Sequence, residues 1–355
     1  MNNNLKSGLL YFYIHFVTEV ICFFMLYRYT GTRPEIWILF LSYDMLAFVP
    51  QGIIGFISDR FPRIPMGSIG LMLMAFSALL FKYVSNPFIS LVVLCLGNCL
   101  VHVNGAETTL RTSEGKLSGS AIFVSGGSFG VVTGRLLAKS GCAFWPIIIL
   151  VLSAVPVTLY AQRYISDEAV PYPEQCRKFN YTKPGVANWL LIILAVAIVA
   201  VRGFMGYGIP TSWNKTAVQT VLLFSFMGVG KALGGIAADR AGFRRTAMVS
   251  VVIAAPLLMA GDRFMAVSLV GVMLFSMTMA ITLGLLVSVL PGTPGLAFGL
   301  TTIGLFLGTM PVFFFKFVTV PANCIMIALL SCLCLGFMEI IIKKDIIIRK
   351  DFDDE

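Results

Sequence analysis

The dominant pattern along the chain is a series of long apolar runs separated by short polar segments. A helix that crosses the hydrocarbon core of a membrane needs roughly 20 mostly apolar residues. By that measure the pattern predicts about twelve spanning helices, and the short connections make most neighbours antiparallel. The predicted spans are 9–27, 36–58, 67–83, 88–110, 118–138, 143–161, 187–207, 218–238, 247–260, 264–290, 296–315 and 322–342.

One connection differs from the others. The segment that follows the sixth predicted span is polar, carries charges of both signs and contains Pro171, Pro173 and Pro184. It lies near the middle of the chain. The pattern therefore predicts an N-terminal half of six helices (1–161), a cytoplasmic linker (162–186) and a C-terminal half of six helices with a short cytoplasmic tail (187–355).

Composition supports a membrane protein. Of the 355 residues, 58% are hydrophobic and 12% are charged, whereas soluble domains carry about 25% charged residues. The net charge of +9 comes from scattered Lys and Arg residues and forms no basic stripe, so we expect no nucleic-acid partner. The chain has no phosphate-binding loop of the Walker type, so ATP hydrolysis is not encoded and we expect no cofactor.

The basic residues predict the orientation, because short cytoplasmic loops are enriched in Lys and Arg. With the N-terminus inside, the inner loops hold more basic residues than the outer loops, and the end of the chain adds four more. We therefore expect a multi-pass protein of the inner (plasma) membrane with both termini cytoplasmic. The inner-loop residues are Arg60, Arg63, Arg111, Lys116, Arg163, Arg177, Lys178, Lys183, Arg240, Arg244 and Arg245.

A short motif occurs twice, each time at the cytoplasmic end of the second helix of a half. Glycine lets a neighbouring helix approach closely, and an aspartate at a helix end accepts hydrogen bonds from the N-terminus of a facing helix. Two copies in matching positions indicate a repeat architecture. The first copy contains Gly55, Asp59, Arg60 and Arg63, and the second contains Gly235, Asp239, Arg240, Gly242, Arg244 and Arg245.

The second copy resembles the loop motif of the major facilitator superfamily, and the first is an eroded version in which Pro62 replaces the motif's glycine. The resemblance covers the whole chain. It implies an all-α integral membrane fold of two six-helix bundles around a central cavity, lined by the first, fourth, seventh and tenth helices. It also implies alternating access, a conformational-switch role for the motif and a monomer.

A narrower resemblance is to the fosmidomycin-resistance branch of drug/proton antiporters. It includes the pair His15 and Glu19 and three further stretches of the N-terminal half. Departures are Val103 and Arg135, where the branch has proline, and the absence of an acidic residue near the end of the tenth span. The other matching segments are 51–55, 96–102, 120–130 and 290–299.

Charged and titratable side chains inside the predicted spans are the candidate functional residues. Placing a charge at the centre of a spanning helix costs roughly 2.5–3.5 kcal/mol, so such groups face a partner or an aqueous cavity. The candidates are Glu19, Asp44, Glu107, Arg202, Lys231, His15 and His102.

His15 and Glu19 are four residues apart and share one helix face. We interpret them as the proton-coupling pair; the alternative is a structural pair that joins helices. His102 and Asn98 share a face of the fourth span and are candidates for the substrate cavity, although His102 is equally consistent with a hydrogen-bonded interior histidine.

Three basic residues receive separate interpretations. Arg111 is four residues from Glu107, and we expect a structural ion pair between them. Arg202 is expected to contact an anionic substrate or to pair with Glu19. Lys231 is assigned to the substrate cavity, with a snorkelling or paired lysine as the alternative.

Glycines recur on the fifth and eleventh spans, at Gly126, Gly130 and Gly134 in the first case. They fit either sliding surfaces between the halves or static packing.

The sequence thus predicts a secondary transporter, with proton-coupled export of a small drug or anionic metabolite as the first interpretation and nutrient-anion uptake as the second. A receptor or enzyme on the same scaffold is the alternative of another class. We expect no enzyme and no metal site, because neither histidine has a metal-ligand spacing in the sequence. The expected partners are the lipid bilayer, a small-molecule substrate and protons.

Overall fold

The computed structural model describes residues 3–30, 36–163, 189–290, 292–314 and 319–353, together with the side chains of all but Thr30 and residues 341–353. These residues form helices and short turns, and twelve helical stretches are long and apolar enough to cross a membrane, as predicted. The first six spans are built by α1 (Asn3–Thr30), α2 (Ile36–Phe48), α3 (Gln51–Arg60), α4 (Met66–Tyr83), α5 (Pro87–Arg111), α6 (Ser118–Lys139) and α7 (Phe144–Ala161). The last six are built by α9 (Trp189–Gly208), α10 (Ala217–Ala241), α11 (Phe243–Ala260), α12 (Met265–Val289), α13 (Pro294–Thr309) with the 3-10 turn η3 (Met310–Phe313), and α14 (Val320–Asp353).

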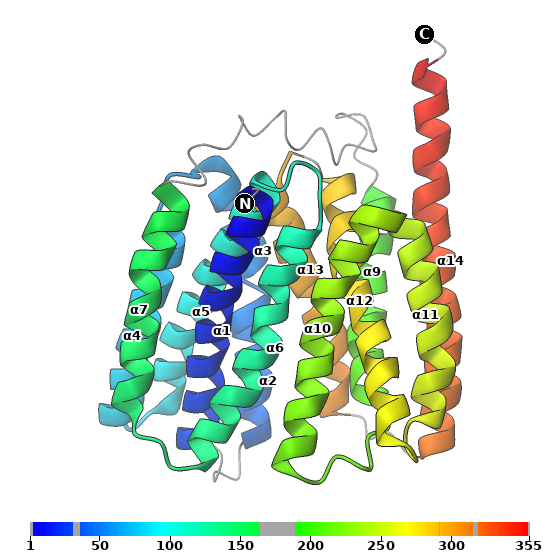
Figure 1. The fold of residues 1–355 in the computed structure, drawn as a ribbon. Helices are drawn as coiled ribbons and strands as arrows, with labels where there is room; N and C mark the ends of the chain where they lie inside the picture. The colour runs from blue at the N-terminus through cyan, green and yellow to red at the C-terminus, as the bar shows by residue number, and fades with distance from the viewer. Residues whose placement is uncertain (1–2, 31–35, 164–188, 291, 315–318, 354–355) are drawn as a thin grey trace.

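The helices lie side by side along one common direction (Figure 1). The chain enters α1 and leaves α14 at the same end of the bundle, which we call the terminal end. We refer to helices α1–α7 as the N-terminal half and to α9–α14 as the C-terminal half. The predicted linker lies almost entirely outside the described residues, which resume at Trp189.

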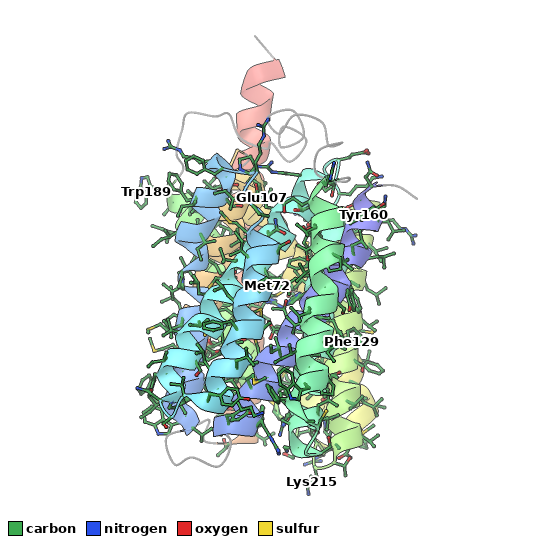
Figure 2. All side chains as sticks on the ribbon, turned by 90° about the vertical axis from the view of Figure 1, so that its left-hand side faces the viewer. Met72, Glu107, Phe129, Tyr160, Trp189 and Lys215 are labelled. Carbon is green, nitrogen blue, oxygen red and sulfur yellow. The ribbon has the colours of Figure 1, made fainter. Side chains whose placement is uncertain are left out.

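The surface around the middle of the bundle is apolar. Exposed apolar side chains include Ile53, Ile149 and Met72, and Figure 2 shows Met72 at mid-height of the bundle. Contact between water and so many exposed apolar side chains is unfavourable, whereas lipid tails are as apolar as these side chains. The chain is therefore a multi-pass membrane protein.

The second predicted span is not one continuous helix. It breaks between α2 and α3 at Val49 and Pro50, although the two pieces together still make one spanning stretch. Proline lacks a backbone N–H and its ring clashes with the carbonyl four residues earlier, so a helix cannot continue through it unchanged. Pro50 instead precedes the first residue of α3.

Three other boundaries differ from the prediction. Helix α1 already begins at Asn3, whereas the polar start of the chain was expected to precede the helix. Helix α11 begins at Phe243, so Arg244 and Arg245 lie in its first turn instead of in a loop. Helix α14 continues to Asp353, where the sequence predicts a tail.

The glycines of α6 serve static packing within the N-terminal half. A Cβ atom at Gly126, Gly130 or Gly134 would overlap backbone carbonyls of α1, so these positions let the two helices touch. The interpretation of these residues as a sliding surface between the halves is therefore wrong. The two halves meet elsewhere, mainly where α3 packs on α13 and where α6 packs on α10.

Candidate functional site

At the terminal end, each motif aspartate accepts two hydrogen bonds from a helix of the opposite half. The Asp59 carboxylate, at the end of α3, accepts from the backbone N–H groups of Gly295 and Leu296, both at 2.9 Å. The Asp239 carboxylate, near the end of α10, accepts from Leu117 at 2.7 Å and Ser118 at 3.0 Å. The first N–H groups of a helix have no partner within the helix and carry its positive dipole end, so a carboxylate suits both. These contacts, which the motif predicts, join the halves at this end.

The motif glycines allow the helices to come this close. A Cβ at Gly55 would overlap the backbone of Gly295, and a Cβ at Gly235 would overlap Ala121 and the Leu117 carbonyl. The motif arginines, in contrast, are exposed at the surface. The Arg60 guanidinium lies 5.3 Å from the ring of Phe56, and Arg244 forms a two-pronged, partly exposed pair with Glu339 at 2.6 and 2.9 Å. Arg63, Arg240 and Arg245 are exposed at the surface of the terminal end.

A buried ion pair lies behind the first aspartate. Arg111 Nη2 contacts Glu107 Oε1 at 2.5 Å, one helical turn away on α5. The second carboxylate oxygen of Glu107 accepts a hydrogen bond from Ser58, which the sequence analysis did not identify. Glu107 is 4% exposed and lies toward the terminal end (Figure 2). The pair therefore ties α5 to α3 beside Asp59.

Deeper in the N-terminal half, His15, Glu19 and His102 form a buried cluster, which we call the triad. Nε2 of His102 lies 2.9 Å from Nε2 of His15 and 3.3 Å from Oε1 of Glu19. Nε2 of His15 is 3.8 Å from the same oxygen. Each of the three residues is 7% exposed. The residues predicted as a coupling pair on α1 thus have a third member on α5.

The other imidazole nitrogens contact backbone carbonyls. His15 Nδ1 is 2.9 Å from the Phe123 carbonyl of α6, and His102 Nδ1 is 3.0 Å from the Asn98 carbonyl. The Asn98 side-chain amide donates toward Glu19 at 3.5 Å and Tyr43 at 3.3 Å. Asn98 therefore supports the triad, and its assignment to the substrate cavity stays a prediction.

Arg202 is buried in the C-terminal half, on α9. Its Nε donates to Thr278 Oγ1 at 2.6 Å and its Nη1 to Met279 Sδ at 3.0 Å, both on α12. Its guanidinium lines a small cavity whose other walls come from α11, α12 and α14. In this structure Glu19 contacts the two histidines, and none of the ion pairs of the described residues joins it to Arg202.

Lys231 on α10 is half-buried and lies within electrostatic range of both Arg202 and Glu19. None of the ion pairs formed by the described residues involves Lys231 or Arg202. Two cations of the C-terminal half therefore lie near each other inside the span region without a carboxylate contact. Asp44 on α2 lies within electrostatic range of Glu19 but makes none of these ion pairs either.

The sequence alone did not identify the convergence of the triad. The spacings of His15 with Glu19 and of Asn98 with His102 each place two polar groups on one helix face. The sequence does not show that these two faces meet. The helices α1 and α5 are far apart along the chain, and spacing within one helix does not indicate which other helix packs against it. The space that admits the His15 ring comes from Gly127, where a Cβ would overlap Nε2.

The twelve spans, with helices of the two halves joined at one end, have the architecture of major facilitator transporters. The fucose:proton symporter FucP of E. coli aligns over 96% of this chain and 99% of its own, with a TM-score of 0.64 and 15% identity. The human organic anion transporter MFSD10 aligns over 94% of this chain and 98% of its own, with a TM-score of 0.67 and 12% identity. FucP in the outward conformation gives a TM-score of 0.59 at 14% identity.

The sequence itself matches no family model and no curated protein. The likeness is therefore one of fold. The chain has the major facilitator fold, as the repeated motif predicts.

Proposed function

We propose that the chain is a secondary active transporter that carries a small organic anion by alternating access. The observation that carries this proposal is the pair of cations Arg202 and Lys231, which lie in the span region and make no ion pair with a carboxylate of the described residues. A charge at this depth is costly unless it faces a partner or water. An anionic substrate would supply that partner.

The contacts at the terminal end support alternating access. Asp59 of the N-terminal half binds α13, and Asp239 of the C-terminal half binds α6. Opening this end requires that these four hydrogen bonds break, and rocking of the halves would then expose a central site to the other side. In this proposal the motif residues act as a conformational switch, and substrate shifts the equilibrium by its differential affinity for the two states.

The fold relatives agree with transport of small solutes, since one is described as a fucose:proton symporter and the other as an organic anion transporter. Proton-driven export, the form that the resemblance to the fosmidomycin-resistance branch favours, stays a prediction, as does proton coupling at Glu19 and His15. The monomeric state and the inner-membrane location with cytoplasmic termini are further predictions.

The experiment is a tolerance assay in an efflux-deficient bacterium. Cells that express wild type, Lys231→Gln or Arg202→Gln are challenged with small anionic antimicrobials, including phosphonates, and with neutral and cationic compounds. We expect wild type to change tolerance to an anionic compound. Raised tolerance indicates export and lowered tolerance indicates uptake.

The expected loss in either variant is roughly 10–100-fold in apparent affinity, because a hydrogen bond to a charged group contributes about 1.5–3 kcal/mol. The matched control is Lys139→Gln, which removes a lysine at the exposed end of α6 and should behave as wild type. Unchanged tolerance with normal expression would reject transport of these compounds. Equal transport of neutral compounds would reject the anion class.

A further inference from the structure

The triad brings three metal-ligand atoms to one point. Nε2 of His15, Nε2 of His102 and Oε1 of Glu19 are separated by 2.9, 3.3 and 3.8 Å. Three atoms with these separations surround a point that lies about 2.0 Å from each, which is the distance at which Zn²⁺ binds imidazole nitrogen and carboxylate oxygen. The donors therefore have the spacing of a metal site before any side chain moves.

The backbone contacts fix both imidazoles in the tautomer that a metal requires. A carbonyl oxygen only accepts, so the Phe123 carbonyl holds a proton on His15 Nδ1 and the Asn98 carbonyl holds one on His102 Nδ1. The Nε2 atoms of both neutral rings then present lone pairs. Metal-binding histidines almost always donate their other ring N–H in this way.

A cation is needed between these groups. Two nitrogen lone pairs and a carboxylate repel one another at such distances, and the site is buried away from water. A proton shared along the N···N line is the simplest cation, and this 2.9 Å contact has the geometry of a hydrogen bond. A divalent ion would engage Glu19 Oε1 together with both ring nitrogens.

We infer that His15, Glu19 and His102 form a binding site for a divalent transition-metal ion of the Zn²⁺ class, with a fourth coordination position open. Two imidazoles and one carboxylate suit Zn²⁺ and related ions and do not suit Mg²⁺ or Ca²⁺, which prefer oxygen ligands. The inference goes beyond the proposed function, since it requires neither a transport direction nor a substrate.

The surroundings define how tightly the ion is held. Lys231, on α10, lies within electrostatic range of Glu19. Its positive charge would repel a metal ion bound at Glu19. An anion or hydroxide at the fourth position would offset that repulsion. Asn98 donates toward the Glu19 oxygen and helps to orient it.

The test measures binding of ZnCl₂ and CoCl₂ to the full chain purified in detergent, by equilibrium dialysis and by the visible spectrum of bound Co²⁺. We expect one tight ion per chain and Co²⁺ bands without a thiolate charge-transfer band. Glu19→Gln and His102→Ala should each weaken binding by about 100-fold or more, since loss of an outer-shell partner alone costs 10–100-fold.

Two matched controls separate the site from non-specific binding. Asp44→Asn removes another carboxylate in electrostatic range of Glu19 without removing a ligand atom, and Cys332→Ser removes an exposed thiol. Both should retain binding within a few-fold.

If His102→Ala fails to fold, His102→Cys decides the question. We expect this variant to bind Co²⁺ with a new thiolate band, which places residue 102 on the ion. No tight binding by the wild type, binding that survives Glu19→Gln and His102→Ala, or no thiolate band in Co²⁺-loaded His102→Cys would overturn the inference.

Discussion

The two halves join each other by the same contact and differ in their interior chemistry. Asp59 binds the start of α13 in the opposite half, and Asp239 binds the start of α6 in the opposite half. The interior of the N-terminal half holds two imidazoles and a carboxylate, whereas the interior of the C-terminal half holds Arg202 and Lys231. The contacts between the halves thus follow the repeat, while the candidate site does not.

The motif copies also differ in the turn that follows the aspartate. Gly242 alone separates α10 from α11, with φ at +84°, a conformation that favours glycine. The first copy has Pro62, which cannot adopt a positive φ, and there α3 and α4 are separated by five residues, 61–65. The eroded copy therefore keeps the packing glycine and the aspartate contact with a longer turn.

The largest expected effect on stability comes from breaking the buried ion pair of the N-terminal half, between Glu107 and Arg111. Glu107→Gln removes the carboxylate that Arg111 and Ser58 contact in the buried core of the terminal end. Breaking a buried pair typically costs about 3–5 kcal/mol, so we expect a fall in the apparent Tm in detergent of roughly 5 °C or more. A Tm within 1 °C of wild type would show that this network contributes nothing to the fold.

A smaller effect is expected for Asp59→Asn and Asp239→Asn, and it should be equal in the two halves. Each change weakens interaction with a helix N-terminus by about 1 kcal/mol, which shifts the equilibrium between closed and open terminal ends roughly fivefold. Spin labels on Ile64→Cys and Gly292→Cys, in a background without native cysteines, report the separation of the halves. The double variant should show additive shifts. A shift in only one single variant would contradict the equivalence of the two copies.

The smallest effect is expected for Glu339→Gln in the C-terminal half. Its partner Arg244 has a side chain that is 56% exposed, so solvent screens the pair. Exposed pairs contribute about 0–1 kcal/mol, and we expect a change in Tm near the error of a thermal scan. A loss as large as that of Glu107→Gln would mean that burial does not explain the difference between the two pairs.

Much of the fold follows from the sequence because length and apolarity alone define a span. The twelve spans were predicted, and so was the contact of a motif aspartate with the N-terminus of a facing helix. The sequence did not indicate that this helix belongs to the opposite half in both copies. The break at Pro50 was missed because the apolar pattern continues through it. The linker lies outside the described residues except at its first positions, so its prediction stays open.

The candidate site was harder to predict because a spanning helix is apolar on every face. In a soluble helix a polar stripe shows which face of the helix is exposed. The seventh span has no such stripe, so the sequence indicates the position of Arg202 along the helix and not the direction of its side chain. In the structure that side chain contacts α12. The meeting of His102 with His15 likewise depends on how α5 packs against α1. Short-range spacing reveals pairs within one helix and does not reveal which helices supply the third group.

All three members of the triad belong to the N-terminal half, while Lys231 belongs to the C-terminal half. A rigid rotation of one half against the other leaves the triad's internal distances fixed and changes the separation of Glu19 from Lys231. The electrostatic energy between these two charges is thus a gauge of how far the molecule has rotated. An ion held by the triad would move with the N-terminal half, and Lys231 is a group of the opposite half that would sense its charge.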